Sequence, residues 1–210
     1  MNNEFLKRFL SSIIILPITF FIVINGSKLF VFFLIFLFLL TSYEWIKMIK
    51  KNLLNKIIGL LFFLISYYSA FQLREIYGFE LFIFILSVCI FTDLGGYFFG
   101  KFFKGPKLTK ISPKKTYTGV IGSFVFPLLF FFVYNTYTNL NFKEIFHLDL
   151  FLLIFVISII SQFGDLIISY FKRVAKIKDT GNVLPGHGGI LDRIDGIIFV
   201  IPILYYLTKL

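Results

Sequence analysis

The hydrophobic positions of this chain fall into long runs that short polar segments separate. Most runs approach the roughly 20 apolar residues that a helix needs to cross a bilayer. The second run is short, and the last carries charges at its start. The pattern predicts about seven transmembrane helices, at approximately 9–26, 29–43, 57–73, 79–100, 118–136, 150–171 and 190–208.

The composition agrees with a membrane protein, because 58% of the residues are hydrophobic and the mean hydropathy is +0.90. We therefore expect an all-α polytopic integral membrane protein. It would form a single domain over residues 1–210, with N-terminal helices over about 1–75 and a catalytic part over about 79–210. The single cysteine, Cys89, excludes an intramolecular disulfide and a cysteine-based metal cluster. Its apolar surroundings predict a packing role.

The basic residues are distributed unevenly between the loops. The chain has 21 Lys and Arg against 11 Asp and Glu, and most of the cations lie in alternate polar segments. The positive-inside rule places these segments and the N-terminus in the cytoplasm. Topology thus explains most of the net charge of +10 without nucleic acid as a partner. We expect a multi-pass protein of the inner (plasma) membrane, with the lipid bilayer around it.

Several acidic residues lie in or at the edge of apolar runs, where an unpaired carboxylate is costly and usually functional. They are Asp93, Asp165, Asp192 and Asp195. The predicted topology puts all of them near the cytoplasmic ends of their helices, where they could meet and hold a cation. Mg²⁺ takes carboxylate oxygens together with substrate phosphates, and a second cation is left open. The alternative is that some of these acids pair with Lys101, Lys172 or Arg193 for structure alone.

Two polar segments carry further candidate chemistry. Residues 101–119 contain Ser112, Lys114, Lys115 and Thr116, whose charges and donors suit a triphosphate. Positive-inside charge alone is the alternative for residues 101–110.

Residues 172–195 form the second polar segment and begin with Lys172 and Arg173. Gly188 and Gly189 let backbone N–H groups approach a phosphate. The neighbouring His187 is a candidate donor or acid–base group, or a surface histidine. On a predicted helix, Gly96 and Gly100 stand four apart, a spacing typical of close helix packing.

Three motifs in this order resemble those of the phosphatidate cytidylyltransferases, also called CDP-diacylglycerol synthases. The resemblance is sharp over roughly residues 91–123 and 161–196, and only compositional over the N-terminal third. The motifs are TDLGGYFFG at 92–100, SPKKT at 112–116, and a long signature from Ser169 through Lys178-Asp179 and Pro185-Gly-His187-Gly188-Gly189 to Asp192-Arg193-Ile-Asp195.

The resemblance implies a reaction in which CTP and phosphatidate give CDP-diacylglycerol and pyrophosphate. It implies a divalent metal on Asp165 and Asp192. The candidate catalytic residues are then Asp165, Asp192, Lys172 and His187. The candidate substrate-binding residues are Asp93, Ser112, Lys114, Lys115, Thr116, Ser169, Arg173, Asp179, Gly188, Gly189, Arg193 and Asp195.

The chain departs from the family pattern at three points. Thr118 and Ile168 stand where the family usually has Glu. The N-terminal region is also shorter than usual. Both replacements reduce negative charge near the site, so we expect a weakened secondary metal or hydrogen-bonding role there.

Other functions remain open at this point. A related CTP-dependent membrane enzyme could act on a polyprenol or an archaeal-type lipid. A transporter could use the acids as a cation path, although none of the four aspartates reaches the outer side. A structural membrane anchor would leave the glycine-rich turn beside Asp192 unexplained. The oligomeric state is also open, with a homodimer as one arrangement.

Overall fold

The computed structural model describes residues 17–50, 52–109, 112, 115–135, 145–146, 148–183 and 188–209. Its main elements are helices: α2 (Ser27–Met48), α3 (Leu53–Phe103), α4 (Tyr117–Asn135), α6 (Leu150–Val174), α7 (Leu191–Ile194) and α8 (Ile197–Leu207). Within these ranges no strand occurs, and an isolated antiparallel bridge pairs Lys107 with Thr116. The prediction of an all-α fold is therefore confirmed.

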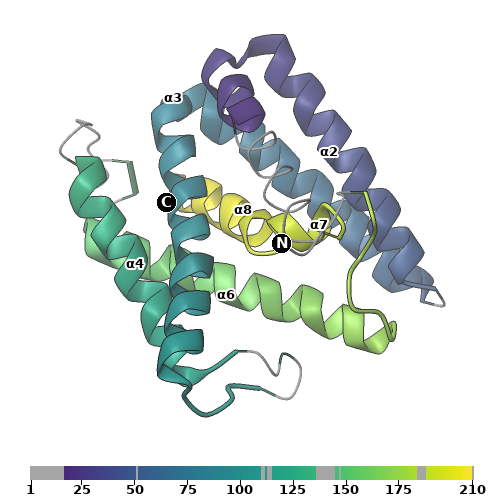
Figure 1. The fold of residues 1–210 in the computed structure, drawn as a ribbon. Coiled ribbons are helices and arrows are strands. Elements are labelled where there is room, and N and C mark those ends of the chain that lie inside the picture. The colour runs from purple at the N-terminus through teal and green to yellow at the C-terminus, as the bar shows by residue number, and fades with distance from the viewer. Residues whose placement is uncertain are drawn as a thin grey trace.

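The long helix α3 organises the other helices (Figure 1). It contacts α2, α4, α6 and α8. Gly78 interrupts it with φ 84° and ψ 170°, a backbone conformation that glycine adopts readily. The two arms on either side, each about 37 Å long at 1.5 Å per residue, correspond to the predicted runs 57–73 and 79–100.

In the part of the chain that the structure describes, four helices are long and apolar enough to cross a membrane: α2, α3, α4 and α6. The predicted run 190–208 is divided into α7 and the 11-residue α8, and α8 alone reaches only about 16 Å. The first part of the predicted run 9–26 lies outside the described residues. The structure thus supports a helical membrane protein, while the number of seven spans, their orientation and the division at about residue 75 stay predictions.

Two hydrophobic clusters hold the helices together. The larger joins α2, α3, α6 and α8 around buried residues such as Phe30, Phe84 and Leu153. The smaller cluster lies where α2, α3, α6, α7 and α8 meet and includes Trp45 and Ile168. Cys89 is buried in the larger cluster, which confirms the packing role predicted for it.

Glycines bring the second arm of α3 directly against α4. A Cβ atom at Gly96 would lie 2.8 Å from the Ser123 Oγ, and one at Gly100 would lie 3.0 Å from the Thr116 Oγ1. A Cβ at Gly95 would meet the carbonyl of Gly122. The close packing predicted for Gly96 and Gly100 is confirmed, and it fixes the segment that leads into α4 against the end of α3.

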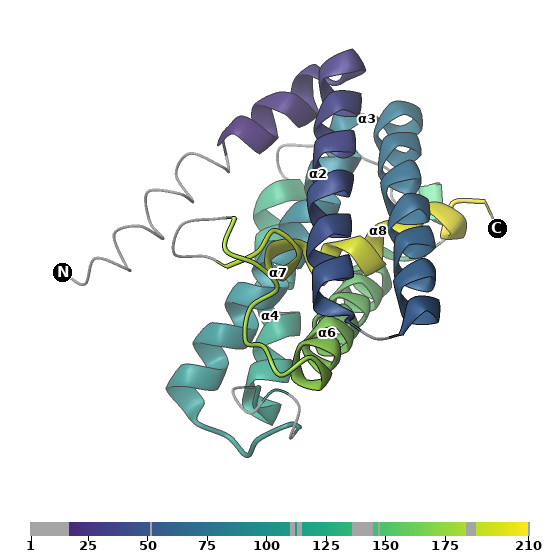
Figure 2. The ribbon, with the colours of Figure 1, turned by 90° about the vertical axis from the view of Figure 1, so that its right-hand side faces the viewer.

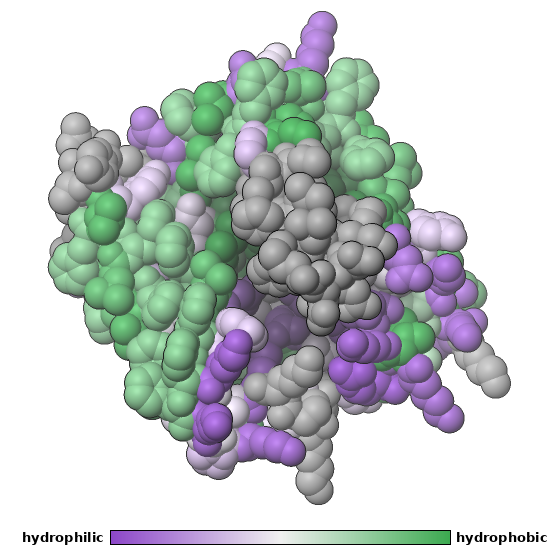
Figure 3. Space-filling model, viewed as in Figure 1, coloured by the Kyte–Doolittle hydropathy of each residue, from purple (hydrophilic) through white to green (hydrophobic). Residues whose placement is uncertain are grey.

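The surface separates into apolar and polar regions. Figure 3 shows hydrophobic residues over the left side and the top, and hydrophilic residues along the lower edge and in the recess beside it. Large apolar side chains are exposed on α2 and α4, where lipid would surround them: Phe32, Phe36, Leu39, Leu129 and Phe132. The exposed Lys101 lies in the last turn of α3, and the exposed Lys104 and Lys107 follow it, so basic residues gather at this end of the helix.

Candidate functional site

A first group of predicted residues forms around Asp165 on α6. The Lys115 Nζ lies 2.6 Å from its Oδ2, and the Ser169 hydroxyl donates to its Oδ1 at 3.1 Å. The same Lys115 ammonium donates to the carbonyl of Gln162 at 3.3 Å. Ser169 follows Asp165 by one helical turn, which places both side chains on the same face of α6.

A second acid, Asp195, lies beside Asp165 because two glycines let their backbones approach. A Cβ at Gly164 would lie 2.7 Å from the Asp195 carbonyl oxygen, and one at Gly196 would meet Ser161 on α6. Asp195 is buried in the turn between α7 and α8, outside the four candidate spans.

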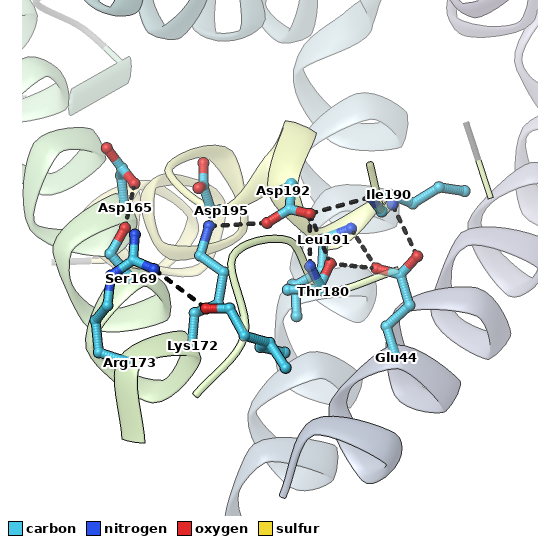
Figure 4. Close-up of polar contacts among 12 residues, drawn as sticks. Glu44, Asp165, Ser169, Lys172, Arg173, Thr180, Ile190, Leu191, Asp192 and Asp195 are labelled. Carbon is cyan, nitrogen blue, oxygen red and sulfur yellow. Dashed lines mark hydrogen bonds and ion pairs between the residues drawn. The ribbon is translucent and has the colours of Figure 1, made fainter. Parts of the chain in front are cut away.

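The other predicted metal ligand, Asp192 on α7, is closely surrounded by donors (Figure 4). Its Oδ2 accepts from the Thr180 N–H at 2.7 Å, the Thr180 hydroxyl at 3.0 Å and the Gly189 N–H at 3.0 Å. Its Oδ1 accepts from the Lys172 Nζ at 2.8 Å. Both side chains of this ion pair are largely buried. The pair joins α6 to α7 across the loop between them.

The glycine-rich turn is shaped around Asp192. Gly188 has φ 87°, and a Cβ there would lie 3.1 Å from the Asp192 Oδ2. A side chain at Gly189 would collide with Thr180 and Glu44. The backbone N–H of Gly189 therefore reaches a carboxylate of the chain itself, and its predicted contact with a phosphate stays a prediction.

The remaining predicted residues lie at the edges of these groups. The Thr116 Oγ1 accepts from the Gly119 N–H at 3.1 Å at the start of α4, and the Ser112 carbonyl accepts from the Lys115 N–H at 3.0 Å. The Arg173 guanidinium donates to the Ile177 carbonyl at 3.1 Å. Four predicted residues have exposed side chains: Asp93, Arg173, Asp179 and Arg193. Two others, Lys114 and His187, lie outside the described residues.

The positions that depart from the family pattern have local partners. The Thr118 hydroxyl lies 3.0 Å from the Thr116 hydroxyl and accepts from the Gly105 N–H at 3.3 Å. Ile168 is buried in the cluster with Trp45. An acid at position 168 would enter apolar surroundings in this chain, so isoleucine suits this site.

Sequence reasoning missed two residues: Glu44, and Thr180 in residues 175–191 between α6 and the first turn of α7, here called the signature loop. Glu44 on α2 is buried and accepts three hydrogen bonds from this loop. Thr180 supplies one of them and also contacts Asp192. Glu44 could have been noticed as an acid at the end of an apolar run, beside Trp45 and among lysines.

The residues around Asp165 fit a magnesium ion better than those around Asp192. Among the residues that the structure describes, no three acidic, histidine or cysteine side chains form a ready metal cage. Mg²⁺ needs few protein ligands, because one or two carboxylates suffice when substrate phosphates supply the rest. Asp165 and the adjacent Asp195 provide such a pair of carboxylates. The Asp192 oxygens already accept four hydrogen bonds, so this residue would have to exchange a partner to bind metal.

The fold and the site together define a helical membrane protein with a polar site built from carboxylates, lysines and a glycine-rich loop. Residues 52–210 match the model of the cytidylyltransferase family. A phosphatidate cytidylyltransferase of Rickettsia felis is 34% identical over 97% of this chain and 92% of its own length. Another of Rickettsia bellii is 33% identical over 97% and 90%. One of Bacillus subtilis is 39% identical over 69% of this chain and 53% of its own length. The chain belongs to the phosphatidate cytidylyltransferase family.

Proposed function

We propose that this protein transfers the cytidylyl group of CTP to phosphatidate, which gives CDP-diacylglycerol and pyrophosphate. The observation that carries the proposal is the similarity to the named Rickettsia felis enzyme over nearly the full length of both chains. The carboxylates and lysines described above provide chemistry that suits this reaction.

In the proposed reaction, a phosphate oxygen of phosphatidate attacks the α-phosphorus of CTP. The bond from the α-phosphorus to the bridging oxygen breaks, and pyrophosphate leaves with its electron pair. Transfer at phosphorus depends mainly on positioning and charge neutralisation. Phosphatidate is an anion at neutral pH, so the attack needs no strong general base. His187 therefore fits the role of a donor that positions a phosphate.

Two lysines are the best-placed cations for the phosphates. Lys115 and Lys172 each contact one carboxylate, Asp165 and Asp192 respectively, and an ammonium group has three donors. Each can therefore hold a phosphate oxygen while its carboxylate keeps it oriented. Mg²⁺ bound at Asp165 would supply further neutralisation of the phosphate charge.

The proposal places the site at the cytoplasmic face of the inner membrane, where CTP is available. The exposed lysines after α3 support this orientation through the positive-inside rule. The lipid tails of phosphatidate would remain in the bilayer. The seven-span topology and a homodimer remain part of the proposal. The homodimer is tested by measuring the mass of the purified protein in its native detergent complex.

The lipid acceptor is tested with purified protein, labelled CTP and Mg²⁺. Parallel reactions offer phosphatidate, a polyprenyl phosphate or an archaeal-type ether lipid phosphate. We expect labelled CDP-diacylglycerol with phosphatidate and little product with the others. A labelled product formed preferentially with another lipid would contradict the proposed substrate while preserving the family chemistry. Cation flux in liposomes without nucleotide would support the transporter alternative.

A further inference from the structure

Glu44 joins the N-terminal helices to the signature loop. Its side chain lies on the last turns of α2 and is 1% exposed. Its Oε2 accepts from the Thr180 hydroxyl at 2.8 Å and from the Leu191 N–H at 2.9 Å. Its Oε1 accepts from the Ile190 N–H at 2.9 Å. One carboxylate thus contacts Thr180 on one side of the glycine-rich turn and Ile190 and Leu191 on the other.

The position of Glu44 is set by its neighbour Trp45. The Trp45 ring makes edge contacts with Phe63 of α3 and Phe171 of α6. Its indole N–H donates to the Asn55 carbonyl at 3.2 Å. Because these contacts hold Trp45 on three sides, they also hold the α2 backbone from which the Glu44 side chain extends.

The loop backbone is fitted closely to the Glu44 side chain. A Cβ at Gly181 would lie 2.7 Å from the Glu44 Oε1, and one at Gly189 would meet the Oε2. Both glycines therefore leave room for this carboxylate. This is a second reason for glycine at position 189, in addition to the approach of its N–H to Asp192.

The contact continues from Glu44 to the residues proposed to handle phosphate. The Thr180 hydroxyl lies between the Glu44 Oε2 at 2.8 Å and the Asp192 Oδ2 at 3.0 Å. A hydroxyl has a single proton, so the two carboxylates share it. Asp192 in turn holds the ammonium of Lys172. Hydrogen bonds and an ion pair thus connect Glu44 with Lys172.

We propose that Glu44 is a positioning residue for the transfer reaction, which acts through Thr180 and Asp192 to hold the signature loop and Lys172 in place. It lies outside residues 52–210, the part that matches the family model. The N-terminal helix α2 would therefore be part of the catalytic unit. This inference rests on the proposed function for its kinetic consequences, whereas its effect on the loop can be measured independently.

The test compares Glu44→Gln with Glu75→Gln, which removes the same charge at a partly exposed position of α3. Glutamine keeps the size but replaces one acceptor oxygen with a donor that faces backbone N–H groups. We expect kcat per molecule of folded, monodisperse protein to fall about 10- to 100-fold in Glu44→Gln. Loss of a hydrogen-bond partner that orients a metal ligand has an effect of this size. Glu75→Gln should retain the wild-type kcat.

Thr180 variants distinguish positioning from a merely structural role. Thr180→Ser keeps the hydroxyl and should stay within about threefold of wild-type kcat. Thr180→Val should lose activity, and its combination with Glu44→Gln should lose less than the product of the two single effects, because both act on one network. A lower yield of Glu44→Gln with unchanged kcat per folded molecule would overturn the proposal.

Hydrogen exchange provides the readout that does not depend on activity. We expect Glu44→Gln to speed amide exchange at Thr180, Ile190 and Leu191, while exchange in α4 stays as in wild type. If the wild-type protein forms no CDP-diacylglycerol, the proposed function fails and the exchange result still tests the loop contact. Unchanged exchange at these amides would overturn the role of Glu44 directly.

Discussion

At the scale of single residues, the site consists of aspartates whose carboxylates are paired with lysine side chains. Lys115 contacts Asp165, and Lys172 contacts Asp192. The second pair is more buried. Removing either charge would therefore leave the other buried without an ion-pair partner. Asp192 therefore supports the loop as well as any role in binding metal.

Replacing Asp192 should lower both the stability and the activity of the protein, and a second substitution should restore part of the stability alone. Asp192→Asn leaves the Lys172 charge buried without its carboxylate, and loss of one partner of such a pair costs about 3–5 kcal/mol. We expect a lower apparent Tm in detergent and loss of activity. The double variant Asp192→Asn with Lys172→Met should regain part of the Tm while remaining inactive. The exposed Lys107→Met serves as the control, and a wild-type Tm in Asp192→Asn would contradict this reading.

Replacing Asp165 should change the dependence on magnesium. Asp165→Asn can keep a hydrogen bond with Ser169 but loses the charge that faces Lys115. We expect kcat to fall about 100-fold or more, beyond the loss typical of groups that only orient metal ligands. The Mg²⁺ concentration for half-maximal activity should rise.

The control for this experiment is Asp149→Asn, which removes the same charge at the opposite end of α6. A normal unfolding temperature for Asp165→Asn would show that the protein is folded. Full activity with an unchanged Mg²⁺ requirement would exclude Asp165 as a metal ligand.

At the scale of the elements, close helix contacts place the polar residues. Gly95, Gly96 and Gly100 of α3 pack against α4, and Gly164 of α6 packs against the turn that contains Asp195. The first contact determines where Lys115 lies, and the second brings Asp195 next to Asp165. Small residues outside the polar groups thus control the distances within them.

A larger side chain between α3 and α4 should therefore disturb the site from a distance. In Gly95→Val, the added atoms would meet the Gly122 carbonyl and the Phe126 side chain. We expect a lower apparent Tm and a fall in activity of about tenfold or more, in line with the cost of overpacking. The neighbouring exposed Leu94→Ala should change neither. A wild-type Tm and wild-type activity in Gly95→Val would contradict the dependence of the site on this helix contact.

The sequence predicted the helical fold, because apolar runs are a strong local signal, and it named as candidates some residues that the structure brings together, such as Asp165 with Lys115 and Ser169. It predicted two separate runs, 57–73 and 79–100, but could not show that the helix continues between them with Gly78 in a non-helical conformation, since glycine occurs in helices and turns alike. It also could not show that the predicted run 190–208 divides into α7 and α8. Glu44 was missed because its partners lie more than 130 residues away along the chain.

At the scale of the whole molecule, the loops that carry the site gather away from the bend of α3. Figure 2 shows the loop after α6 returning beside α2 to α7. The segment after α3 reaches α6 itself through the contact of Lys115 with Asp165. If α3 crosses the membrane twice, its two ends face the same side, and the bend at Gly78 faces the other.

This arrangement can be tested by labelling single cysteines in membranes. Cys89 is buried, so a Cys89→Ala background allows Lys104→Cys and Glu80→Cys to be compared. We expect an impermeant thiol reagent added outside intact cells to label position 80 and spare position 104. Inside-out vesicles should give the reverse. Labelling of both positions from one side would contradict the proposed crossing of α3.

In the proposed reaction, a phosphate oxygen of the lipid attacks the α-phosphorus of CTP. This step is tested by supplying the purified protein with phosphatidate, Mg²⁺ and CTP labelled at either the α- or the γ-phosphate. We expect the α-label to enter the lipid product and the γ-label to appear in pyrophosphate, in equal amounts. Transfer of the γ-label to the lipid, or no labelled lipid from either CTP, would contradict it.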